Sequence, residues 1–171
     1  SRAPYSEHLS STSILGAGKV SGRLANGLSI GALTAVTERE FVDTYDPSTG
    51  RYGSEEVEPL TGFGVMRLQQ EFGKDASTVG VILTGVERDL NSLEAENLLA
   101  RQAVTGGVDW KLRFDHGGFE VGGHAGFSNV LGAATAMRRI QQSSAHYFQR
   151  PDASHVSLDS STTSLSDYTV G

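Results

Sequence analysis

The sequence predicts an all-β protein: an antiparallel up-and-down meander of six to seven long strands, part of a transmembrane β-barrel, with one short helix in a long loop. Apolar and polar residues alternate over segments of roughly 10 to 13 residues, whereas strands of soluble proteins usually have about 5 to 6. Short turns alternate with long polar links, as in outer-membrane barrels. No apolar stretch approaches the length of a transmembrane helix. We therefore expect residues 1–171 to form a single β-barrel segment.

Three hairpins are predicted, each with two alternating segments and a short turn. Their strands are expected at about residues 13–24 and 28–37, 60–72 and 77–86, and 103–114 and 119–130. The first turn contains Asn26-Gly27, the strongest short hairpin signal, because both residues tolerate a positive φ. The other two turns, at 73–75 and 115–118, are rich in Gly and Asp, which are ordinary turn formers.

The links between hairpins are much longer than these turns. They cover about residues 38–59, 87–102 and 131–163. The last link contains a predicted helix at about 133–147, where Met137, Ile140 and Tyr147 lie near helical spacing and could rest on the barrel rim. Residues 164–171 resemble the start of a seventh strand.

Because side chains alternate along a strand, each segment separates into two faces. The apolar, candidate lipid-facing set is Ile14, Val20, Met66, Leu68, Val108, Trp110, Leu112, Val121 and Phe127. The polar, candidate lumen-facing set is Lys19, Arg23, Arg67, Glu71, Asp109, Lys111, Arg113, Glu120 and His124. The segment Thr78 to Val86 is apolar on both faces, so the pattern does not orient it.

Alternation alone fits two environments. In a soluble β-domain the apolar face covers a core, and in a membrane barrel it meets lipid while the charged face lines a polar lumen. Strand length and loop asymmetry favour the barrel. Glycines on the apolar face, such as Gly16, Gly62 and Gly106, also favour it, because they would leave a sandwich core underfilled.

Composition and motifs argue against several other functions. The formal net charge of −6 gives no basic surface for nucleic acid, and the absence of Cys excludes disulfides and thiol chemistry. Residues 16–22 imitate a dinucleotide-binding loop, but the next strand follows too closely for the helix that such a loop requires. No cofactor is expected.

Catalytic and metal-binding arrangements are also not predicted. Residues 43–50 carry carboxylates and hydroxyls but lack EF-hand spacing, and the five histidines have no metal-ligand spacing. Asp109 and Glu120 could form a catalytic pair, but Lys111 and Arg113 beside them favour a charge ladder.

Three stretches resemble a known family: residues 14–31, residues 57–61, and residues 143–152, which contain the run Tyr-Phe-Gln-Arg-Pro-Asp. They look like the C-terminal region of large bacterial surface proteins of unknown function. In that family a carbohydrate-binding-like module precedes an outer-membrane barrel. The resemblance implies a barrel without catalytic residues. The module is not part of this segment, so the resemblance does not extend to direct sugar binding by it.

These observations lead to the following expectations. The chain is a non-catalytic segment of a bacterial outer-membrane barrel with a transport, binding or anchoring role. Six or seven strands are too few to close a typical barrel, so its partners would be membrane lipids and further strands from the full-length chain or a neighbouring subunit. The main alternative is a soluble antiparallel β-domain that binds a ligand or a protein. A third is a barrel-embedded enzyme that uses loop residues such as Asp43, His146 or Asp152.

Overall fold

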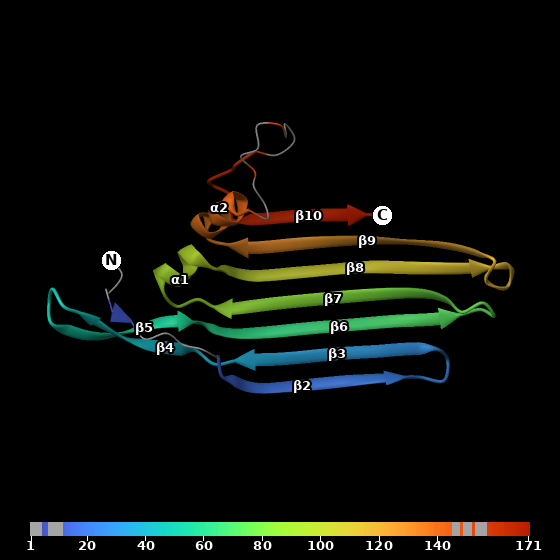
Figure 1. Cartoon of the computed structure of the whole chain (residues 1–171), viewed down its shortest axis with the longest axis horizontal. Helices are drawn as coiled ribbons and strands as arrows, with labels where there is room; N and C mark the ends of the chain where they lie inside the picture. Colours follow the sequence, from blue (N-terminus) through green and yellow to red (C-terminus); the bar gives the residue numbers. More distant parts are fainter. Residues whose placement is uncertain (1–4, 7–11, 145–147, 149–151, 153–156) are drawn as a thin grey trace.

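A long, seven-stranded antiparallel sheet dominates the computed structural model, which describes residues 5–6, 12–144, 148, 152 and 157–171. The strands lie in the order β10-β9-β8-β7-β6-β3-β2 (Figure 1). Their bounds are Ile14–Arg23 (β2), Leu28–Thr37 (β3), Leu60–Phe72 (β6), Ser77–Asp89 (β7), Ala100–Phe114 (β8), Phe119–Gly132 (β9) and Ser164–Val170 (β10). The predicted all-β antiparallel meander is confirmed. The sheet is open, with β2 and β10 as its edges.

A second, three-stranded sheet occupies much of the first predicted loop. It consists of β1 (Tyr5–Ser6), β4 (Glu40–Asp46) and β5 (Arg51–Glu58) in the order β1-β4-β5. The prediction of a loop over 38–59 was therefore wrong. The turn residues 46–50 lie at the tip of the β4–β5 hairpin, where the Asp46 carboxylate accepts hydrogen bonds from the backbone and side chain of Ser48. Asp-Pro marked a turn, as expected, but the flanking segments pair as strands.

Two short helices lie at the end of the sheet opposite its short turns (Figure 1). The first, α1 (Leu93–Leu98), was not predicted, and Ser92 caps it by accepting a hydrogen bond from the backbone N–H of Ala95. The second, α2 (Ala134–Gln142), falls within the predicted helix but ends earlier. A 3-10 turn, η1 (Asp115–Gly117), joins β8 to β9.

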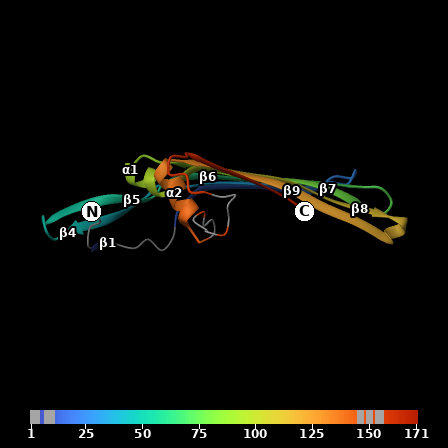
Figure 2. The same ribbon diagram turned by 90° about the horizontal axis from the view of Figure 1, so that it is seen from above.

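Among the described residues, the large sheet is a single layer without a second layer across its strands (Figure 2). The buried hydrophobic core of the described residues consists of Val42, Ala136 and Met137, and the last two belong to α2. The chain exposes 11719 Å², whereas a compact protein of 18.1 kDa exposes about 8,000 Å². In the part of the chain that the structure describes, this sheet therefore has no protein core of its own.

The tight β2–β3 turn requires glycine at position 27. Gly27 has a φ of +86°, and a Cβ there would lie 2.6 Å from the backbone oxygen of Glu71 on β6. The Gly27 carbonyl also accepts a hydrogen bond from the backbone N–H of Glu71, so the turn is tied to β6.

We expect Gly27→Ala to lower the free energy of unfolding by more than the ~1–2 kcal/mol of a left-handed alanine, because the clash with Glu71 adds to that cost. Gly50→Ala is the matched control. Gly50 has a φ of +68°, but a Cβ there would meet nothing within 4 Å. Denaturant titration of both variants would measure the difference, and equal losses would contradict the proposed clash.

Candidate functional site

The strand register divides the large sheet into two chemically different faces. Across the middle of the sheet, Met66 pairs with Leu83, and Leu83 pairs with Gly106. One position along, Arg67 pairs with Ile82, and Ile82 pairs with Gly107. Since directly opposed residues project to the same side of a sheet, these rows define an apolar face and a charged face.

The apolar face carries no Asp, Glu, Lys or Arg through the middle of the sheet. One complete row across all seven strands is Gly22, Ile30, Leu68, Val81, Val108, Ala125 and Val170. The next row is Val20, Ala32, Met66, Leu83, Gly106, Phe127 and Tyr168. The first charge is Glu87, which is in register with Gly62 near the helix end. Many of these side chains are exposed in this chain, Val81 by 42% and Val108 by 41%.

Eight of the nine candidate lipid-facing residues share this face. They are Val20, Met66, Leu68, Val108, Trp110, Leu112, Val121 and Phe127. Ile14 does not follow the alternation, because a bulge between Ile14 and Gly16 puts it in register with Thr37 on the charged face. All nine candidate lumen-facing residues share the charged face. Whether these faces meet lipid and water stays a prediction.

The structure also orients β7, which the sequence pattern did not. Its pairing with β6 and β8 puts Val79, Val81 and Leu83 on the apolar face. Ile82 faces the other way, beside Arg67. Only the register with neighbouring strands carries this information.

Ion pairs on the charged face lie between the middle of the sheet and its short turns. Arg67 on β6 reaches across β7 to Asp109 on β8, where its two terminal nitrogens donate to the two carboxylate oxygens. The pair passes over Gly80, where a Cβ would lie 2.5 Å from an Arg67 nitrogen. Glycine at this position of β7 therefore leaves room for the ion pair.

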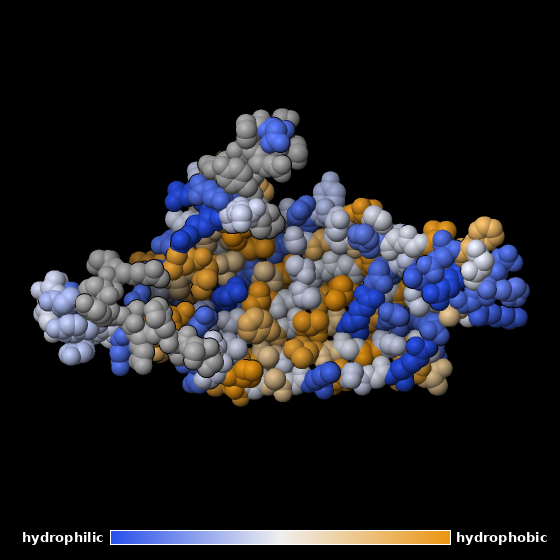
Figure 3. Space-filling view, in the orientation of Figure 1, coloured by the Kyte–Doolittle hydropathy of each residue, from blue (hydrophilic) through white to orange (hydrophobic). Residues whose placement is uncertain are grey.

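Two further groups of ion pairs lie on the charged face. Glu120 on β9 contacts both Lys111 at 3.2 Å and Arg113 at 3.0 Å, and Glu71 contacts Arg23 at 2.9 Å. Asp109 and Glu120 are thus engaged by different cations, in the arrangement of a charge ladder. Figure 3 shows one broad face of the sheet, on which hydrophilic residues concentrate towards the short-turn end.

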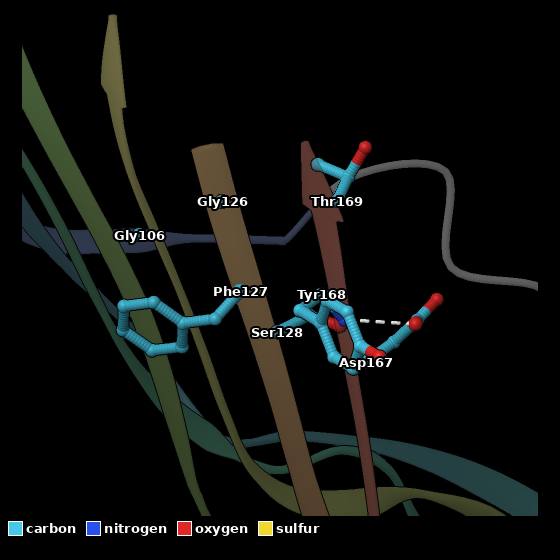
Figure 4. A pocket seen from close by; sticks show the side chains of 7 residues that line it. All are labelled: Gly106, Gly126, Phe127, Ser128, Asp167, Tyr168 and Thr169. Carbon is cyan, nitrogen blue, oxygen red and sulfur yellow. Dashed lines mark hydrogen bonds between the residues drawn. The ribbon is translucent and has the colours of Figure 1, made fainter. Parts of the chain in front are cut away.

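Glycines on the apolar face make room for aromatic rings of neighbouring strands. A Cβ at Gly123 would lie 2.5 Å from the Trp110 ring, and a Cβ at Gly106 would lie 2.6 Å from the Phe127 ring. Figure 4 shows Phe127 extending toward Gly106 beside a shallow depression at the β8–β9–β10 edge, with Tyr168 on the outermost strand. The rings therefore lie along the sheet surface.

The helix end holds a polar junction that the sequence did not predict. Arg39, between β3 and β4, donates to Glu56 on β5 at 2.7 Å and to Asp89 at the end of β7 at 2.8 Å. The Glu56 side chain is only 10% exposed. This junction ties the small sheet to the large one. Its partners are 17 and 50 residues from Arg39, so no local pattern reveals it.

A second tether fixes the loop after α2. The buried Gln141 amide donates to the Asp159 carbonyl at 2.8 Å, and its oxygen accepts from the Asp159 backbone N–H at 2.9 Å. Hydrogen bonds from Ser161 hold the pKa of the Asp159 carboxyl below its usual range. Likewise, hydrogen bonds from Ser13 lower the pKa of Glu40, and those from Ser48 lower that of Asp46. These carboxylates stabilise loop structure.

The described residues include no group of His, Asp and Glu side chains that could hold a metal ion. His146, named in the enzyme hypothesis, lies outside the described residues, and Asp43 lies on β4 opposite Ser54. None of the described helices is long and apolar enough to cross a bilayer.

Comparison with known proteins identifies one family. The model of a family described as Domain of unknown function (DUF5916) matches residues 3–164. No curated protein and no solved structure matches the chain significantly.

Proposed function

The chain belongs to the DUF5916 family, whose function is unknown, and from the geometry we propose that its seven-stranded sheet is part of the wall of a bacterial outer-membrane β-barrel. Its apolar face contacts lipid, and its charged face lines a polar interior. The wall serves transport, binding or anchoring rather than catalysis, and the small sheet and helices lie at one rim.

The observation that carries this proposal is the uncovered apolar face. Through the middle of the sheet it is free of charge on all seven strands, and many of its described side chains, such as Val81 and Val108, are exposed. An exposed apolar surface of this extent marks a contact with a membrane or another protein.

The height of the uncharged band favours a bilayer as that contact. On β8 it extends from Phe114 to Val104, and the next row, at Gln102, contains Glu87. Ten residue steps at about 3.4 Å each, on a strand tilted by about 40°, span roughly 26 Å. The lipid-facing band of outer-membrane barrels is about 25 Å tall. The two heights agree.

The opposite face supports the same orientation. Its carboxylates and cations between the middle of the sheet and the short turns are ion-paired and partly exposed, with side-chain exposures of 35% for Arg67 and 43% for Asp109. Such groups are stable beside water but costly in hydrocarbon. A polar barrel interior provides that environment.

Single cysteines at two adjacent positions of β7 test the proposal, since the chain has no native Cys. Val81 and Ile82 are exposed by 42% and 38% and lie on opposite faces. Nitroxide labels on Val81→Cys and Ile82→Cys would be compared, in membranes, for collision with oxygen and with a water-soluble nickel complex. We expect the label at 81 to collide mainly with oxygen and the label at 82 mainly with nickel.

A soluble β-domain gives a different result. Its label at position 81 would be shielded from both reagents by protein, and the protein would stay monodisperse in buffer without detergent. Either outcome would overturn the assignment of the apolar face to lipid.

A further inference from the structure

The direction of the two edge strands determines what can close this sheet. The strands β2 and β10 are separated by five others, and each neighbouring pair is antiparallel. With seven alternating strands, the first and last point the same way, and both arrows in Figure 1 do so. If these edges paired directly, the junction would be parallel.

Both edges present unpaired backbone groups. On β2, the backbone N–H of Leu24 donates to the carbonyl of Leu28. Because hydrogen-bonded residues alternate along an antiparallel pair, the even-numbered residues of β2 bond to β3. The backbone N–H and C=O groups of the odd-numbered residues Ala17, Lys19, Ser21 and Arg23 therefore point away from the sheet. Beside β10, Gly171 and His124 exchange two backbone hydrogen bonds. By the same alternation, the backbone N–H and C=O groups of Ser166, Tyr168 and Val170 point away from the sheet.

In a bilayer these outward groups require partners. Each unsatisfied N–H or C=O in hydrocarbon costs several kcal/mol, so a membrane sheet must close. If the seven strands closed on themselves, the barrel would be narrower than an eight-stranded barrel, whose interior is just wide enough for side chains. It would also need the parallel junction.

A second copy of the sheet does not resolve the problem. Copies inserted with the same orientation join β10 of one to β2 of the next, and those strands again run parallel. Pairing β2 with β2 of a copy would be antiparallel, but it would put the helix ends of the two copies on opposite sides of the membrane.

We infer that an odd number of additional strands, supplied by polypeptide outside the seven-stranded sheet, lies between β10 and β2, and that the strand next to each edge runs antiparallel to it. This inference rests on the proposed membrane function. It makes the total strand number even, as in single-chain bacterial barrels. Side chains of the strand beside β2 are apolar on the face that carries Val20 and polar on the face that carries Lys19.

Photo-crosslinking in the full-length protein in its membrane tests the inference. A benzophenone amino acid would replace Ser21 on β2 or Thr169 on β10, with Ser29 on β3 as control, because Ser29 has known neighbours on β2 and β6. Mass spectrometry of the crosslinked peptides identifies the partner. We expect the control to crosslink to β2 or β6. We expect the two edge positions to crosslink to peptides outside residues 14–37 and 60–171, at yields within about threefold of the control.

Two results would overturn the inference. A crosslink between the Ser21 position and residues 164–171 would establish a parallel β2–β10 junction, within or between copies. No crosslink from either edge, with the control intact, would establish free edges. The spin-label pair at Val81 and Ile82 separates these failures from failure of the membrane assignment, since it reports lipid contact whatever closes the sheet.

Discussion

Replacement of Val81 by arginine is expected to make folding into a bilayer less favourable by about 2–4 kcal/mol, the cost of an Arg at the midplane of a membrane barrel's lipid face. Val81 pairs with Leu68 on one side and with Val108 on the other. On the apolar face, two further uncharged rows lie between this row and the short turns, up to Phe72, and the row of Met66 lies towards the helix end. At that depth the guanidinium cannot easily reach either interface. Denaturant titration of the full-length protein in vesicles would measure the loss.

Ile82→Arg is the matched control. It introduces the same side chain one residue along, at nearly the same depth and exposure, but on the face that carries Arg67. Like charges directly opposite on a sheet cost up to about 1 kcal/mol, and Asp109 already neutralises Arg67. The control should therefore lose about 1 kcal/mol or less. Losses of equal size at 81 and 82 would mean that the two faces of the sheet meet the same medium.

The local patterns of the sequence predicted most of the large sheet. Period-two alternation and the Asn26-Gly27 turn located Leu28–Thr37 and Leu60–Phe72 at the bounds that the structure has. This succeeded because alternation and turn chemistry are properties of adjacent residues. The charged face followed for the same reason, since Lys111 and Arg113 alternate with apolar neighbours.

Features that depend on distant residues were missed. The hairpin of β4 and β5 contains Glu55, Glu56 and Glu58, which look like a solvated loop, and its stability depends partly on Arg39 and Asp89 from other segments. The orientation of β7 depends on register with its neighbours. A bulge between Ile14 and Gly16 puts Ile14 on the charged face, whereas simple alternation puts it on the apolar face.

Met137→Ala is expected to lower the stability of the helix end by about 2–5 kcal/mol, the range for truncating a buried Met. Met137 is 0% exposed, and its terminal carbon lies against Gly132, where a Cβ would be only 2.9 Å away. The helix α2 and the loop that Gln141 holds should then open together.

Hydrogen exchange resolved by peptide would measure this opening, with Arg138→Ala as control. Arg138 is exposed on the same helix, and alanine is at least as good a helix former. We expect faster exchange over residues 134–144 and 157–163 in Met137→Ala, and unchanged exchange over β6, β7 and β8. In the described residues α2 packs mainly on α1, β9 and β10, and the apolar face of β6, β7 and β8 is covered by lipid in our proposal. Faster exchange in those strands as well would mean that the core around Met137 stabilises the sheet, and that lipid contact alone does not hold it.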